Sequence, residues 1–73
     1  MLANGIIVYP NPTNNTLNIK THLSIVYELK DATGKIILTG NNNQLYLNTL
    51  QTGVYFLTIT HDGKQFNKKI IKQ

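Results

Sequence analysis

The sequence predicts an all-β fold, a seven-stranded antiparallel β-sandwich, from three observations. The chain has 73 residues and no cysteine, so it forms a single domain with a purely apolar core and no disulfides. Nine threonines and abundant isoleucine, valine, tyrosine and phenylalanine favour strands, whereas glycine, proline and asparagine interrupt nearly every potential helix. Finally, short apolar alternations are repeatedly followed by turn residues, at a spacing typical of sandwiches.

Seven strands are expected, and turn residues separate them. The first strand ends at Pro10, because Pro10 and Pro12 stiffen an extended corner, and Asn14 and Asn15 then turn the chain into the second strand. The expected strands cover residues 6–9, 16–21, 25–30, 35–39, 44–48, 53–61 and 64–71.

Residues 31–34 are expected to form a four-residue hairpin loop between the third and fourth strands. In such a loop the Asp31 side chain bonds to the backbone ahead of it, and Gly34 takes a left-handed conformation. The loop would pair Lys30 with Lys35.

This register has consequences for the sandwich core. It would place Ile36 opposite Leu29 and Leu38 opposite Tyr27 on one apolar face, with Ile37 outward. A polar loop at 41–43 then leads to the fifth strand. The core is expected to be shared with Leu17, Ile19, Leu45, Leu47 and Leu50.

The last two strands form the hairpin with the strongest turn signal. Asp62 and Gly63 favour a two-residue type I′ turn, in which both residues have positive φ. Only Lys68 interrupts the apolar face that follows from this turn, so Lys68 is expected at a rim or a bulge. The predicted pairs are His61 with Lys64, Ile59 with Phe66, Leu57 with Lys68, and Tyr55 with Ile70.

The charge and composition disfavour several function classes. The net charge of +4 comes from lysine alone, and nucleic-acid binding is not expected because arginine makes most bidentate and stacking contacts to bases and phosphates. Two separated histidines and three acidic residues, without cysteine, predict no metal site and no cofactor. The longest apolar run has four residues, so no membrane insertion is expected.

Catalytic residues are not expected either. Ser24 is the only serine, and neither His22 nor His61 has the acid and oxyanion hole that a serine nucleophile requires. Glu28 and Asp31 are interpreted as a surface charge and a turn residue. The sequence therefore predicts a domain that is not an enzyme.

Tyr46 and Phe56 are the aromatic residues expected to point outward. Outward aromatic rings stack on sugars or contact partner proteins. An accessory adhesion or carbohydrate-binding module of a larger secreted enzyme is therefore kept as an alternative function.

Several short motifs occur in a fixed order along the chain. They are Val-Tyr-Pro-Asn-Pro-Thr followed by Leu-x-Ile at 8–19, Asp-x-x-Gly-Lys at 31–35, Leu-x-x-Gly-Val-Tyr-Phe at 50–56, Gly-Lys at 63–64 and Lys-Lys-Ile-Ile-Lys-Gln at 68–73. This ordered combination resembles the type A C-terminal sorting domains of cargo proteins of the type IX secretion system in Bacteroidota. The resemblance covers residues 6–73 and implies an immunoglobulin-like seven-stranded sandwich.

The resemblance also implies a function. In that family the domain is an address: a separate N-terminal signal exports the protein to the periplasm, and the domain then directs it through the outer-membrane translocon. A sortase-like cysteine protease removes the domain, and the cargo is attached to anionic lipopolysaccharide or released. Residues 1–5 are expected to be linker or an added start residue after an upstream cargo domain, with the cleavage site at or before Met1.

The partner-recognition residues implied by the resemblance lie in the proline corner, the glycine-tyrosine motif and the terminal strand. Gly53 also has a local interpretation as a backbone turn, and Tyr55 and Ile70 as core residues. Lys69 is expected outward, and Lys72 at the free end of the chain. The implied set is Pro10, Asn11, Pro12, Gly53, Tyr55, Lys68, Lys69, Ile70, Ile71 and Lys72.

Overall fold

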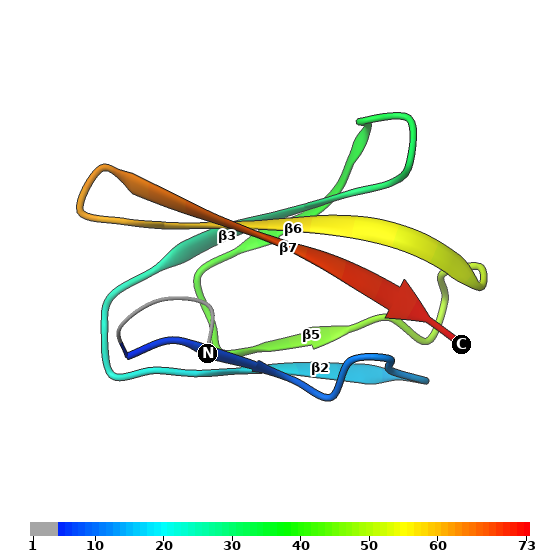
Figure 1. Cartoon of the computed structure of the whole chain (residues 1–73), viewed down its shortest axis with the longest axis horizontal. Coiled ribbons are helices and arrows are strands. Elements are labelled where there is room, and N and C mark those ends of the chain that lie inside the picture. Colours follow the sequence, from blue (N-terminus) through cyan, green and yellow to red (C-terminus); the bar gives the residue numbers. More distant parts are fainter. Residues whose placement is uncertain (1–4) are drawn as a thin grey trace.

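The computed structural model describes residues 5–73 and confirms an all-β sandwich (Figure 1). Its strands are β1 (Ile7–Tyr9), β2 (Thr16–Lys20), β3 (Val26–Lys30), β4 (Ile36–Gly40), β5 (Gln44–Tyr46), β6 (Gly53–His61) and β7 (Lys64–Lys72). Each boundary lies within two residues of the predicted one. Most of the predicted linker, residues 1–4, lies outside the described residues. No helix in residues 5–73 is long and apolar enough to cross a membrane.

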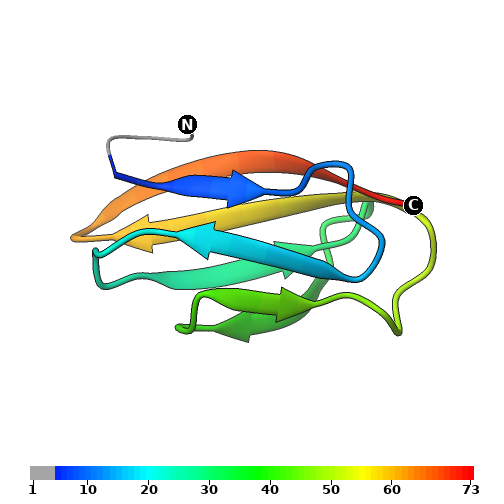
Figure 2. The same cartoon turned by 90° about the horizontal axis from the view of Figure 1, so that it is seen from below.

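The strands form two antiparallel sheets that pack face to face (Figures 1 and 2). One sheet has the order β1-β2-β5, and the other has the order β4-β3-β6-β7. In constant-type immunoglobulin domains the fourth strand joins the sheet of the first, second and fifth strands. Here β4 pairs with β3 instead, which leaves β1 and β5 as the edges of a narrow sheet and β4 and β7 as the edges of a wide one.

The register predicted for the β6–β7 hairpin is confirmed. Asp62 and Gly63 both have positive φ, at 53° and 78°, as a type I′ turn requires. The pairing runs without interruption from His61 opposite Lys64 to Gly53 opposite Lys72, and includes all four predicted pairs. Lys68 is exposed within regular pairing, so it lies at a rim and not at a bulge.

The register predicted for the β3–β4 hairpin is wrong. Lys30 pairs with Ile36 instead of Lys35, and a bulge then places Leu38 opposite Leu29 and Gly40 opposite Tyr27. Ile36, predicted to be core, is 48% exposed. Ile37, predicted to point outward, is half-buried and packs against the core.

Two contacts, one in the loop and one across the sheet, explain this register. The loop closes one residue later than expected, because the Asp31 backbone N–H donates to the Lys35 carbonyl oxygen at 2.9 Å. The Tyr27 ring also needs room: a Cβ added at Gly40 would lie 2.6 Å from the Tyr27 hydroxyl oxygen, so a glycine opposite Tyr27 is accommodated where a leucine is not. The Tyr27 hydroxyl donates to Asn42 Oδ1 at 2.8 Å, and burial raises its pKa.

Asp31 gives this loop a pH dependence. Its Oδ1 accepts hydrogen bonds from the Thr33 hydroxyl (2.6 Å), the Thr33 N–H (2.9 Å) and the Lys35 N–H (3.0 Å). Chiefly the Thr33 hydroxyl bond, and then the Lys35 N–H bond, hold the pKa of Asp31 below its ordinary value of 3.8. A carboxyl whose pKa is lowered by folding stabilises the fold above its unfolded pKa, and this contribution disappears as the pH falls through the folded pKa.

We therefore expect Asp31→Asn to be less stable than the wild type at neutral pH, and the difference to shrink on acidification. Urea unfolding of both proteins, from neutral pH down to below the ordinary aspartate pKa, measures this difference. A gap between the two curves that does not change with pH would contradict the expectation.

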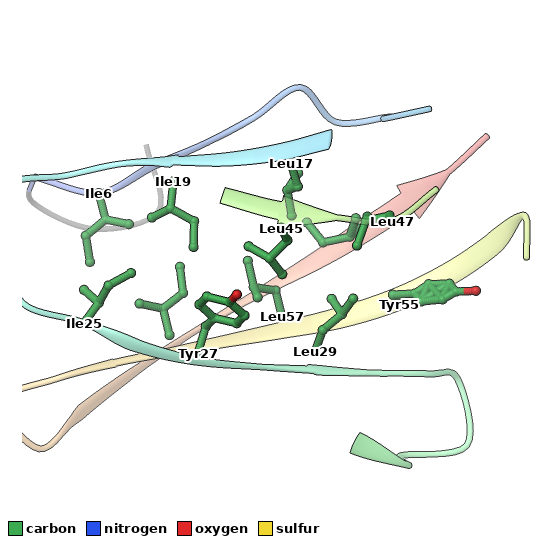
Figure 3. Packing of buried hydrophobic residues seen from close by; sticks show 12 residues of the cluster. Ile6, Leu17, Ile19, Ile25, Tyr27, Leu29, Leu45, Leu47, Tyr55 and Leu57 are labelled. Atoms are coloured by element: carbon green, nitrogen blue, oxygen red, sulfur yellow. The ribbon is translucent and has the colours of Figure 1, made fainter. Parts of the chain in front are cut away.

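The core lies between the two sheets, where side chains of both inner faces interdigitate (Figure 3). The sequence correctly placed the alternating leucines and isoleucines of β2, β3, β5 and β6 in this core. Ile36 does not belong to it, and Phe66, Leu38 and Leu50 contact it while partly buried. The buried apolar set is Ile6, Leu17, Ile19, Ile25, Tyr27, Leu29, Leu45, Leu47, Tyr55, Leu57, Ile59 and Ile70.

Candidate functional site

The proline corner and the terminal strand, which are distant in sequence, are joined in the structure. After β1, the corner at residues 10–13 reaches the C-terminal end of β7 (Figure 2). The Asn11 side-chain amide donates from Nδ2 to the Lys69 carbonyl oxygen at 2.9 Å, and Asn11 Oδ1 accepts from the Ile71 N–H at 3.0 Å. The Asn11 amide group thus bonds to the edge of β7 as a neighbouring strand would.

Thr13 continues this pairing with its backbone. Its N–H donates to the Ile71 carbonyl oxygen at 2.9 Å, and its carbonyl oxygen accepts from the Gln73 N–H at 2.8 Å, so that Thr13 forms a parallel bridge with Lys72. Thr13 is only 2% exposed, and its hydroxyl donates to the Thr16 carbonyl oxygen at 2.6 Å. Residues 10–13 and 69–73 together are called the corner–strand junction below.

The two prolines explain why a side chain is needed at this junction. Pro10 and Pro12 follow cis peptide bonds and have no backbone N–H to donate to the edge of β7. Within the corner, the Asn11 amide and the Thr13 N–H therefore supply the donors. The junction covers half of an edge strand whose exposed backbone would otherwise be open to pairing with other chains.

Lys72 is the implied recognition residue whose position differs most from expectation. Predicted to lie at the free end, it is the last residue of β7, pairs with Gly53 and is 8% exposed. Its Nζ donates to the Gln73 backbone oxygen at 3.1 Å. The strand is one residue longer than predicted, since the ladder with β6 continues to Lys72, which also forms the bridge with Thr13. The side chains of Lys68, Lys69 and Ile71 are exposed, and Ile70 is in the core.

Gly53 and Tyr55 lie beside the same end of β7. Gly53 has a φ of +156°, which L side chains rarely adopt, and it pairs with Lys72. Tyr55 is buried opposite Ile70, and its hydroxyl donates to the Gln51 carbonyl oxygen at 2.6 Å. A tyrosine near the start of the sixth strand that bonds a few residues upstream is the tyrosine corner of immunoglobulin-like sandwiches. These two residues thus fix the chain where it enters β6, next to the junction.

The structure therefore brings the implied recognition residues together in one region. Their motifs meet along the paired ends of β6 and β7 and the corner on the outer edge of β7. The family model of the secretion system C-terminal sorting domain matches residues 7–73. The chain belongs to this family. A comparison with curated proteins gave no match.

Membership in the family establishes the general role of the chain. It is a C-terminal sorting signal of type IX secretion, which marks cargo for export through the outer membrane. The family is one of sorting signals and is not catalytic.

The rest of the described chain offers little catalytic chemistry. His61 Nδ1 lies 2.7 Å from the backbone oxygen of Ser24, so this contact does not involve the serine hydroxyl. No cluster of three or more His, Cys, Asp or Glu in residues 5–73 could hold a metal ion. Two shallow depressions, of about 430 and 390 Å³, lie outside the junction, around Val26 and Gly40 and around Ile7 and Lys20.

Tyr46 and Phe56, the two aromatic residues predicted to point outward, are exposed but do not share a surface. Tyr9 on β1, which the sequence did not single out as outward, is also exposed, at 46%. Tyr46 is 62% exposed on β5, on the outer face of the three-stranded sheet. Phe56 is 44% exposed on β6, on the outer face of the four-stranded sheet. Because the sandwich core separates them, they cannot form one sugar-stacking platform.

Asn11 provides a test of the junction. We expect Asn11→Ala to lower the free energy of unfolding by ~1–3 kcal/mol, because two solvent-accessible hydrogen bonds of about 0.5–1.5 kcal/mol each are lost. Asn11→Asp should cost at least as much, since the Nδ2 donor becomes an oxygen that faces the Lys69 carbonyl oxygen. Urea unfolding measures both changes. Asn14→Ala is the control, as Asn14 is exposed next to the corner; equal effects of the two alanine variants would contradict the assignment.

Proposed function

We propose that this chain is the C-terminal sorting signal of a longer cargo protein, with residues 6–73 as the sorting domain. The signal directs the upstream cargo through the type IX translocon of the outer membrane to the cell surface or the medium. A sortase-like cysteine protease then removes it. The domain itself performs no reaction and needs no cofactor.

The observation that supports this proposal best is the corner–strand junction. Asn11 bonds residues that are 58 and 60 positions away along the chain, so the first and last family motifs form one hydrogen-bonded unit. The central motif adjoins this unit, since Gly53 pairs with Lys72 and Tyr55 with Ile70. A translocon component that reads this end of the sandwich would therefore contact all three motifs at once.

Within this region we assign different roles to the residues. The exposed Pro10, Asn11, Pro12, Lys68, Lys69 and Ile71 are accessible for direct contact with a partner. The buried Tyr55, Ile70 and Lys72, together with Gly53, act by holding the backbone in place.

A reporter fusion tests the proposal. The domain is fused to the C-terminus of a reporter that already has an export signal, and the fusion is expressed in a type IX-competent cell. We expect the reporter on the cell surface or in the medium without the domain attached, and in the periplasm when the domain is omitted. Retention of the full fusion in the periplasm, in a strain that secretes a known cargo, would refute the sorting function. Export with the domain still attached would refute only its removal.

A further inference from the structure

A mixed apolar and basic patch crosses the outer face of the four-stranded sheet. Register places Ile36, Lys30, Phe56 and Lys69 in one row across β4, β3, β6 and β7. Val54 and Ile71 pair with each other on the same face, two residues along from Phe56 and Lys69. We call these six residues the outer-face patch.

Four of the six members of the patch are exposed, and Lys30 and Val54 are half-buried. Directly paired side chains on one face of a sheet have Cβ atoms about 4.5–5.5 Å apart, so the members of the row are neighbours across the sheet. Ile36, Phe56 and Ile71 are 48%, 44% and 40% exposed. Single exposed apolar residues are ordinary, but a contiguous exposed apolar group with polar residues around it is typical of an interaction surface.

The charges of the patch indicate what kind of partner fits it. Lys30 and Lys69 lie on either side of the Phe56 ring, one on each neighbouring strand. The acidic residue on this face, Glu28, is in the next row, opposite Thr39 and Thr58. A ligand over Phe56 therefore meets an apolar centre with an ammonium group on each side.

We propose that the outer-face patch docks an apolar protein segment that carries carboxylates, on a component of the type IX machinery. This inference rests on the proposed sorting function and deepens it. The patch is continuous with the corner–strand junction, because Asn11 bonds the backbone of Lys69 and Ile71, whose side chains belong to the patch. The junction thus positions two of its six members.

A protein partner fits this patch better than a lipid surface. Segments that bind anionic membranes through charge carry clusters of about four to eight basic residues, whereas this patch has only two lysines. Its apolar members also lie flat on a sheet and do not form the apolar side of an amphipathic helix.

The reporter fusion, combined with matched variants, tests the patch. We expect Phe56→Ser to lower the secreted fraction ~10-fold or more, since an aromatic anchor at the centre of an interface contributes at least the ~1.4 kcal/mol that a tenfold change represents. The double charge reversal Lys30→Glu with Lys69→Glu should have a similar effect. The double variant Lys30→Arg with Lys69→Arg, which keeps both positive charges, should be secreted like the wild type. Controls on the opposite outer face are Tyr46→Ser and Lys20→Glu, both at exposed positions, which should change secretion less than ~2-fold.

The outcomes separate this inference from the function on which it rests. Loss of secretion by the wild-type fusion overturns both. If the wild type and a folded Phe56→Ser variant are both secreted normally, the docking role of the patch is wrong but the sorting function stands. Thermal melting shows whether the variants fold. If Phe56→Ser does not fold, the charge-reversal variant decides the test. Binding of the wild-type chain, but not of Phe56→Ser, to phosphatidylglycerol vesicles at physiological salt would replace the protein partner by a lipid surface.

Discussion

Truncation of Leu57 to alanine is expected to lower the free energy of unfolding by ~2–5 kcal/mol, the range observed when buried leucines are replaced by alanine. Leu57 is fully buried near the middle of β6, between Leu29 on β3 and Lys68 on β7, and points into the space between the sheets (Figure 3). The truncation leaves a cavity in the core, and the narrow three-stranded sheet offers few other side chains that can move to fill it.

The size of this effect matters because the domain is small. A chain of this length has a total stability of only about 5 kcal/mol, so the variant should populate the unfolded state at 37 °C. Urea unfolding followed by far-UV circular dichroism measures the loss. Lys68→Ala is the matched control, because Lys68 faces Leu57 across the hairpin and is exposed; it should change stability by less than ~0.5 kcal/mol. A Leu57→Ala variant as stable as this control would place Leu57 outside the core.

The β6–β7 hairpin was predictable because its turn is local. The pair Asp62 and Gly63 specifies two positive φ angles in adjacent residues, and one such turn fixes the register of every pair behind it. The apolar face then follows from alternation alone.

The β3–β4 hairpin was not predictable in the same way, because two loops of different length fit its turn residues. The loop from Asp31 is closed by Lys35, and the extra residue is absorbed by a bulge that turns Ile37 toward the core. The need for Gly40 under the Tyr27 ring depends on a contact across the sheet, which no window of the sequence contains.

The motifs implied most members of the candidate site, but not Thr13 and Gln73, and they did not predict how these residues are arranged. Asn11 bonds a backbone carbonyl and a backbone N–H of β7. Because every non-proline residue has both groups, the sequence does not indicate which residues of β7 bond to Asn11. One signal was available: an asparagine between two prolines is the only residue there that has a backbone N–H and a side-chain amide.

Deletion of residues 68–73 is expected to abolish secretion of the reporter fusion. The deleted segment pairs with β6 from Leu57 to Gly53 and contains the fully buried Ile70. Its loss exposes Tyr55 and Leu57, opens the edge of β6 to other chains, and removes every β7 partner of Asn11 and Thr13. Folding and recognition should therefore fail together, with the reporter left in the periplasm.

Point variants in the same segment separate folding from recognition. Lys68→Gln with Lys69→Gln changes two exposed side chains and leaves their backbone pairing intact, so its thermal melting should match the wild type. Lys72→Gln is unsuitable for this purpose, because Lys72 is buried and bonded to Gln73. If the folded double variant stays in the periplasm, the secretion machinery recognises the lysine side chains directly. If it is exported normally while the deletion is not, the segment acts through the strand it completes. Export of the deletion itself at the wild-type level would show that the terminal strand is not needed for sorting.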